Sequence, residues 1–167
     1  MNEAAQRLKL GLGVALAIVA LDQALKALAL RLVFDPPRVL EITPFFNLAP
    51  AWNRGVSFGL LAHDSPWAPW LLTALAAAIA IFLLRWLSRA ETPWVAVALG
   101  LVLGGAVGNA VDRLRFGAVV DFLDFHAFGW HFWAFNLADS AITIGAAGLL
   151  LTSLWAERLS RLADRPK

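Results

Sequence analysis

The chain has 167 residues, of which 60% are hydrophobic and only 16% are charged, against about 45–50% and 25% in soluble globular proteins. Its mean hydropathy of +0.68 means more apolar surface than one small core can bury, so the sequence predicts a membrane protein. Cysteine is absent, and the net charge of +2 is spread among loops. These features exclude disulfides, a thiolate nucleophile and a Cys-based metal site, and they give no support to nucleic-acid binding.

Four apolar stretches are each long enough to cross a hydrocarbon core of about 30 Å. The second and third carry no charge, whereas the first is interrupted by Asp22, Gln23 and Lys26. We therefore predict an all-α membrane protein with four transmembrane helices, folded as a single integral membrane domain over residues 1–167. The expected spans are residues 10–30, 66–84, 92–111 and 140–156.

The amino terminus shares two features with a secretory signal peptide. Arg7 and Lys9 precede an apolar run, and Ala27-Leu28-Ala29 mimics a cleavage site. However, three more spans follow, and the i,i+4 spacing of Asp22 and Lys26 fits an ion pair on a continuing helix. We expect the first stretch to remain a membrane helix, with Asp22 and Lys26 serving folding.

Basic residues predict the orientation of the bundle. Four spans place both termini on one side, and the basic residues of the termini and of the loop between spans two and three lie together on that side. They are Arg7, Lys9, Arg85, Arg89, Arg158, Arg161, Arg165 and Lys167. The positive-inside rule then predicts cytoplasmic termini. Residues 33–65 and 114–138 would face outward, and the β-favouring run Arg38–Thr43 predicts short strands between the first and second helices.

Polar residues gather at the expected outer ends of spans three and four. They are Asn109, Asp112, Arg113, Asp121, Asp124, Asn136 and Asp139. An ionisable residue at membrane depth costs about 2.5–3.5 kcal/mol on insertion scales, so such residues are by default functional or paired. The spacing of Asn109, Asp112 and Arg113 places them on one helix face.

Simpler structural roles exist for several of these residues. Asn136 could cap the fourth helix with Asp139 favouring its dipole, and Asp112 could form an interfacial ion pair with Arg113. Together, however, two carboxylates, two amides and an arginine exceed what capping requires. The cluster therefore favours a functional site.

Two carboxylates without cysteine or an evident metal set indicate acid/base hydrolysis. One ionised Asp takes a proton from a water that attacks a carbonyl, and the other, protonated, donates to the carbonyl oxygen. Asp121 and Asp139 are the natural pair. The residues alone leave open which of the two carries the proton.

Two other chemistries are weaker. Gly55-Val-Ser57-Phe-Gly59 matches a nucleophile elbow, with His126 and His131 downstream, but that motif requires a turn above a parallel sheet. Asp124, His126 and His131 lack a recognised metal-ligand spacing. We predict no metal and no cofactor.

Small residues recur along spans three and four, in the pattern that lets membrane helices approach closely. They are Gly100, Gly104 and Gly108 in span three, and Ala141, Gly145 and Gly148 in span four. We expect these residues to serve helix contact.

Several motifs resemble those of the bacterial lipoprotein signal peptidases, or signal peptidase II. The blocks are Asp22-Gln-Ala-Leu-Lys26, Asn53-Arg-Gly-Val-Ser-Phe-Gly59, Gly108-Asn-Ala-Val-Asp-Arg113, Val119-Val-Asp-Phe122 and Phe135-Asn-Leu-Ala-Asp139. They occur in the order and spacing of the family across nearly the whole chain.

The resemblance implies a membrane aspartic endopeptidase of the bacterial inner membrane, sensitive to globomycin. Its substrate would be a prolipoprotein with a diacylglyceryl cysteine, cut just before that cysteine. Asp121 and Asp139 would be catalytic, with Asn109, Arg113 and Asn136 around them. Asn53 and Gly55 would face the substrate, and Asp22, Lys26 and Asp112 would be structural polar residues.

A small proton-coupled transporter or channel is the alternative, since intramembrane aspartates can relay protons. Asp22 is the residue that it would use. Against it, the polar residues cluster at one face of the membrane and leave no polar track through spans two to four. The expected partners are the prolipoprotein, membrane lipid and globomycin-type inhibitors, and no nucleic acid.

Overall fold

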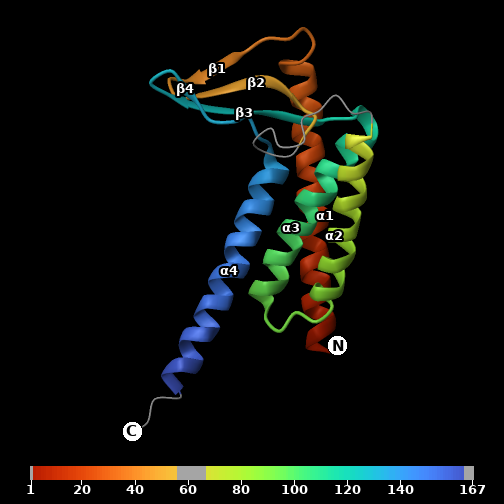
Figure 1. Cartoon of the computed structure of the whole chain (residues 1–167), viewed down its shortest axis with the longest axis vertical. Coiled ribbons are helices and arrows are strands. Elements are labelled where there is room, and N and C mark those ends of the chain that lie inside the picture. The colour runs from red at the N-terminus through yellow and green to blue at the C-terminus, as the bar shows by residue number, and fades with distance from the viewer. Residues whose placement is uncertain (1, 56–66, 164–167) are drawn as a thin grey trace.

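The computed structural model describes residues 2–55 and 67–163, and its four long helices form a bundle (Figure 1). The helices are α1 (Glu3–Leu32), α2 (Ala68–Leu87), α3 (Pro93–Phe116) and α4 (Leu137–Ala163). Each contains a stretch long and apolar enough to span a membrane. The predicted fold class is thus confirmed. Helices α1, α3 and α4 extend beyond the apolar stretches because their polar ends are also helical.

Helix α3 is the centre of the bundle and contacts the other three helices. A Cβ atom on Gly104 would lie 2.7 Å from the Ala15 carbonyl oxygen of α1, and one on Gly145 of α4 would lie 2.6 Å from that of Ala98. No side chain fits at either position. The close helix contacts expected from the small residues are therefore present.

The end of α3 turns the chain back over the helix bundle. Gly117 adopts a left-handed conformation with φ 70°, and its N–H donates to the carbonyl of Arg113. This is a common way to end a helix, and glycine adopts it without steric cost. A strand begins two residues later and crosses the ends of the helices (Figure 1).

A four-stranded antiparallel sheet lies across this end of the bundle (Figure 1). Its strands are β1 (Leu40–Thr43), β2 (Phe46–Asn53), β3 (Val119–Ala127) and β4 (Trp130–His131), in the order β1-β2-β3-β4. The strands predicted between the first two helices are β1 and β2. The sheet is larger than predicted, since β3 and β4 come from the segment between α3 and α4.

An apolar cluster fixes the sheet to the end of α1. It comprises Ala29 and Val33 from α1 and the residue after it, and Val120 and Phe122 from β3. Side chains alternate between the two faces of a strand. Asp121, between these two residues, therefore points to the opposite face.

Candidate active site

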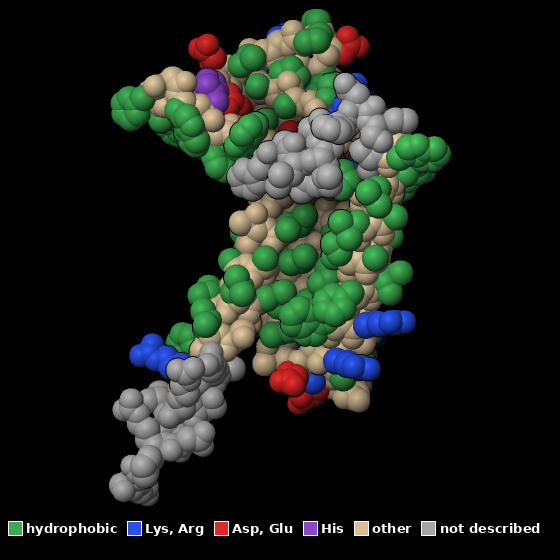
Figure 2. Space-filling view, viewed as in Figure 1, with side chains coloured by type: hydrophobic (Ala, Val, Ile, Leu, Met, Phe, Trp, Pro, Cys, Tyr) green, Lys and Arg blue, Asp and Glu red, His purple; other side chains and the backbone are tan. Residues whose placement is uncertain are grey.

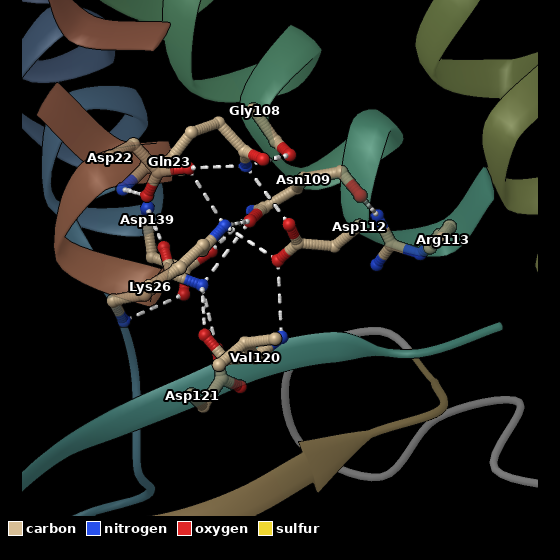
Figure 3. A network of polar contacts seen from close by, with 12 residues as sticks. Asp22, Gln23, Lys26, Gly108, Asn109, Asp112, Arg113, Val120, Asp121 and Asp139 are labelled. Atoms are coloured by element: carbon tan, nitrogen blue, oxygen red, sulfur yellow. Dashed lines mark hydrogen bonds and ion pairs between the residues drawn. The ribbon is translucent and has the colours of Figure 1, made fainter. Parts of the chain in front are cut away.

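Polar side chains from α1, α3, β3 and α4 meet where the helices reach the sheet (Figure 3). Among the residues drawn are Asp22 and Lys26 on α1, Asn109 and Asp112 on α3, and Asp121 on β3. The predicted cluster is brought together in space except for Asp124, which contacts Asn47 and His131 instead. The network also includes Asp22 and Lys26 of α1, and 83 residues separate Lys26 from its partner Asn109.

Lys26 is the cationic centre of the network. Its Nζ lies 2.8 Å from Asp22 Oδ2 and 2.8 Å from Asp112 Oδ2, and it donates to Asn109 Oδ1 at 2.9 Å. Lys26 is only 2% exposed. An ammonium group has three N–H donors, so all its hydrogen bonds are satisfied within the protein. The expected Asp22–Lys26 pair is present, and Asp112 joins it.

The two carboxylates paired with Lys26 also tie backbone segments together. Asp22 Oδ1 accepts from the N–H of Ala138 at the start of α4, at 3.0 Å. Asp112 Oδ2 accepts from the N–H of Val120 in β3, at 3.1 Å. These contacts join α1, α3, α4 and β3 at a single point.

Asp121 and Asp139 are held by amide groups. Asp121 accepts from Asn136 Nδ2 at 2.6 Å through Oδ1 and from Asn53 Nδ2 at 3.0 Å through Oδ2. Asp139 accepts from Asn109 Nδ2 at 2.8 Å through Oδ1 and from the Asn136 N–H at 3.2 Å through Oδ2. Each carboxylate oxygen thus has one N–H donor. A second lone pair on each oxygen is left for a proton or a water.

Asn136 has a structural and a site role together. Its Oδ1 accepts from the Asp139 N–H at 3.0 Å, while its own N–H donates to Asp139. This reciprocal pair is a capping box at the start of α4. The side-chain Nδ2 of Asn136 meanwhile reaches Asp121. Asn136 therefore caps α4 and also contacts Asp121, although the sequence alone suggested these two roles as alternatives.

The environment of Asp121 favours its protonated form. Its pKa is raised to about 7, chiefly by burial and secondly by the nearby charge of Asp139. Hydrogen bonds from Asn53 and Asn136 and the charge of Lys26 oppose this shift. Among the described residues, no ion pair joins a Lys or Arg to either carboxylate.

A cavity of about 240 Å³ adjoins Asp139 and the side chain of Asn53, whose amide donates to Asp121. Its polar end is formed by Asn53, Asn109, Arg113 and Asp139. The remainder is apolar and is lined by Leu72, Leu75, Ala76 and Ile79 of α2, Ala106 of α3, Val119 of β3 and Ile142 of α4. The cavity therefore joins an apolar groove at the depth of the spans to the polar site.

Arg113 holds the chain that follows β2. Its Nη2 donates to the Gly55 carbonyl at 3.3 Å, and its Nη1 donates to the Asn109 carbonyl at 3.4 Å. Gly55 in turn donates to Asn53 Oδ1 at 3.1 Å. The suggested ion pair between Asp112 and Arg113 does not form among the described residues, because Asp112 is turned toward Lys26.

The residues of the two weaker chemistries lie elsewhere. Asp124 accepts from Asn47 Nδ2 at 3.2 Å and contacts His131 Nδ1 at 3.0 Å, and His126 stacks on His131. No group of three candidate metal ligands occurs within residues 2–55 and 67–163. Ser57 and Gly59 of the elbow motif lie outside the described residues.

Gln23 was missed by the sequence analysis as a member of the network. Its Nε2 donates to Asp112 Oδ1 at 2.9 Å, and its Oε1 accepts from Arg115 Nη1 at 3.3 Å. The available signal was an amide within an apolar span, since such a group requires a partner inside the protein. Gln23 thus gives the second oxygen of Asp112 a hydrogen-bond donor from α1.

Comparisons with known proteins identify the family. The family model of Signal peptidase (SPase) II matches residues 14–155. The chain belongs to the signal peptidase II family. It is 45% identical to a lipoprotein signal peptidase of Methylobacterium sp. (strain 4-46), covering 94% of this chain and 96% of that one. It is 47% identical to one of Paraburkholderia phymatum, covering 90% of each chain.

Solved structures also support this assignment. A bacterial membrane enzyme determined by the in meso method at 2.3 Å resolution matches with a TM-score of 0.77 and 27% identity, covering 94% of this chain and 93% of that one. Another at 1.9 Å resolution matches with a TM-score of 0.72 and 29% identity, covering 86% and 92%. The protein is thus a multi-pass membrane peptidase of the aspartic class.

Proposed function

We propose that the protein removes signal peptides from prolipoproteins, with Asp121 and Asp139 as its catalytic pair. The single observation that carries this proposal is the pair of carboxylates held from β3 and α4 by amide donors alone, beside an apolar groove. The named relatives are lipoprotein signal peptidases. The substrate class follows from that relationship.

The reaction needs one protonated and one ionised carboxyl group. Asp121, whose pKa is raised to about 7, holds the shared proton and donates it to the scissile carbonyl oxygen. Asp139 lies at the N-terminus of α4, where the helix dipole favours negative charge. It takes a proton from the attacking water to give a tetrahedral diol. As this intermediate collapses, Asp139 passes its proton to the leaving nitrogen and Asp121 takes back a proton from one hydroxyl, which restores both carboxyl groups.

Two residues assist the pair without exchanging protons. Asn53 and Arg113 both line the polar end of the cavity and bring N–H donors to it. They orient the extended substrate chain, together with Gly55, whose backbone lies between them. Asn109 and Asn136 fix the positions of the two carboxyl groups through hydrogen bonds to Asp139 and Asp121, respectively.

The apolar groove fits a lipid-modified substrate. Helices α2 and α4 both line it, yet they make no direct contact with each other within the described residues. A substrate held in the bilayer can therefore enter laterally between them. We assign the groove to the diacylglyceryl cysteine and the adjoining signal peptide, with cleavage just before that cysteine.

The decisive experiment is cleavage of a prolipoprotein by the purified protein, with and without the diacylglyceryl group. Release of the signal peptide from the lipidated form alone is expected, and globomycin should block it. Equal cleavage of both forms would contradict the assigned substrate. No cleavage of either form would contradict the proposed activity.

The orientation of the bundle is also a proposal. Arg85 and Arg89 lie at the end of the bundle away from the sheet, and the positive-inside rule places that end in the cytoplasm. The chain has no cysteine, so Ser88→Cys and Glu41→Cys, both at exposed positions, each introduce a single thiol. In intact cells whose outer membrane has been permeabilised, an impermeant maleimide should label only the Glu41→Cys variant. Labelling only Ser88→Cys would reverse the orientation.

A further inference from the structure

The half of the sheet farther from the candidate active site, formed by the second half of β3 with β4 and the start of β2, has two chemically different faces. Asn47, Asp124, His126 and His131 are linked to one another by hydrogen bonds and ring stacking on one face. Residues 125–135 contain no Asp, Glu, Lys or Arg. Most of the aromatic side chains of this segment belong to the other face.

Ring contacts connect the aromatic residues into a continuous row. The ring centroid of Phe125 lies 4.7 Å from that of Phe46 and 5.9 Å from that of Phe135. The centroid of Phe132 lies 5.9 Å from that of Phe135 and 6.1 Å from that of Trp130. Phe125 is 43% exposed, Phe132 is 46% exposed and Trp130 is 64% exposed, and Phe128 at the turn is fully exposed. We call Phe125, Phe128, Trp130 and Phe132 the aromatic patch.

The alternation of β3 determines the direction of this face. Phe125 and Asp121 are four residues apart on one regular strand, so their side chains lie on the same face. Asp121 points at Asn136, where α4 begins. Figure 2 shows hydrophobic side chains at the free end of the sheet on the side nearer the helices, below the histidine.

The position of α4 sets the depth of the patch. Only four residues separate Phe132 from the start of α4 at Leu137, and α4 exposes Ile144, Leu150 and Leu151 as a membrane span must. The sheet extends sideways beyond α4 (Figure 1). The patch therefore lies at the level where the span leaves the hydrocarbon, beside a lipid-facing helix.

We propose that the aromatic patch inserts into the headgroup zone of the adjoining leaflet and anchors the free end of the sheet to lipid. Trp and Phe favour this zone because their rings are apolar while an indole N–H can remain hydrated. An exposed cluster of this size without charge marks an interaction surface. Strand β3 is then held at both ends, by α1 at Val120 and by lipid at the patch, which fixes the height of Asp121 above the helix ends.

Site-directed spin labelling tests this in phosphatidylcholine and phosphatidylglycerol vesicles. Phe128→Cys is labelled with a nitroxide, and Glu41→Cys is the matched control, because Glu41 pairs with Asn47 on the polar face and is exposed. The label at 128 should be relaxed more by oxygen than by an aqueous nickel chelate, and the label at 41 should show the reverse. Equal access of the nickel chelate to both labels would overturn the proposal.

A second variant tests whether the aromatic rings hold the hairpin in place. Ala127→Cys is labelled in the parent chain and in a chain with Phe128→Ser, Trp130→Ser and Phe132→Ser, after both are shown to unfold at the same temperature. Access of the nickel chelate to the label should rise in the triple variant. Unchanged access would show that the patch does not anchor the hairpin.

Discussion

Two groups of buried carboxylates lie next to each other in this protein, and they differ in what neutralises them. Asp22 and Asp112 share the ammonium group of Lys26 at 2.8 Å each. Asp121 and Asp139 have amide donors instead, and the ion pairs of the described residues include neither. Burial alone does not make a carboxylate reactive. The absence of a paired cation leaves the second group free to exchange protons.

We propose that the same difference gives the two groups different functions. Lys26 and its partners join α1, α3, α4 and β3, and Asn109 links them to the second group by accepting from Lys26 and donating to Asp139. A lysine has no acceptor, so Lys26 fixes which way the Asn109 amide is turned. The ion-paired group thereby positions the proton-exchanging group. Breaking each in turn should separate stability from activity.

The largest effect is expected from Asp121→Asn and Asp139→Asn. Each amide keeps the shape of the side chain but cannot exchange a proton with water or the scissile carbonyl. Signal-peptide release should fall by about 10³-fold or more, while the thermal unfolding temperature in detergent stays close to that of the parent. Since acid and base act as a unit, the double variant should be scarcely worse than either single variant.

Asp124→Asn is the matched control for these variants. Asp124 is also a buried carboxylate of β3, but it lies on the opposite face and contacts Asn47 and His131. It should retain much of the parent activity. The assignment of the catalytic pair is wrong if Asp124→Asn is as inactive as Asp121→Asn. It is also wrong if either Asp121→Asn or Asp139→Asn still cleaves the substrate at a substantial rate.

Lys26→Met should instead reduce stability. The change leaves Asp22 and Asp112 without their cation, and breaking a buried ion pair on one side typically costs about 3–5 kcal/mol. A lower unfolding temperature and a lower yield of folded protein are expected, and Asp22→Ala should behave similarly. Adding Asp22→Asn and Asp112→Asn to Lys26→Met should recover part of the loss. A stable, folded but inactive Asp22→Ala variant would place Asp22 in the catalytic site.

The sequence predicts the helices and the polar residues of the site better than it predicts which residues and strands pair with one another. Apolar length and small-residue spacing identify membrane spans because both depend on local composition. The pairing of Asp112 with Lys26 depends on the rotation of α3 against α1, which spacing within one helix does not specify. Strand β3 escaped prediction for a related reason. Its partner β2 is separated from it by two helices, and its aspartates were interpreted only as site residues.

Gly108→Ala tests how closely the two groups of carboxylates depend on helix packing. A Cβ atom there would lie 2.6 Å from Asp22 Oδ2, so this oxygen, which also pairs with Lys26, must shift. Overpacking of this kind costs about 1–3 kcal/mol, measured as a lower unfolding temperature. Gly148→Ala is the control, because its Cβ would meet only Ala98 Cβ at 3.5 Å. Equal stability of the two variants would contradict this account.

The smallest expected effects concern the pH dependence of activity. The pKa of Asp121 is raised from 3.8 to about 7, chiefly by burial and then by Asp139. The folded protein therefore binds this proton more tightly than the unfolded chain. The contribution of Asp121 to stability is full below pH 3.8 and is lost as the pH rises through about 7. Activity should also decline on the alkaline side with an apparent pKa near 7, as the shared proton is lost.

Asn53→Ala should move this alkaline decline to higher pH. The Asn53 Nδ2 hydrogen bond to Asp121 Oδ2 stabilises the ionised form and lowers the pKa of Asp121, so removing it lets Asp121 keep its proton longer. Asn47→Ala is the matched control on the same strand, because the Asn47 amide contacts Asp124 and not Asp121. Its pH profile should coincide with that of the parent. A decline that moves to lower pH in Asn53→Ala, or moves equally in both variants, would show that Asp121 does not hold the proton on which activity depends.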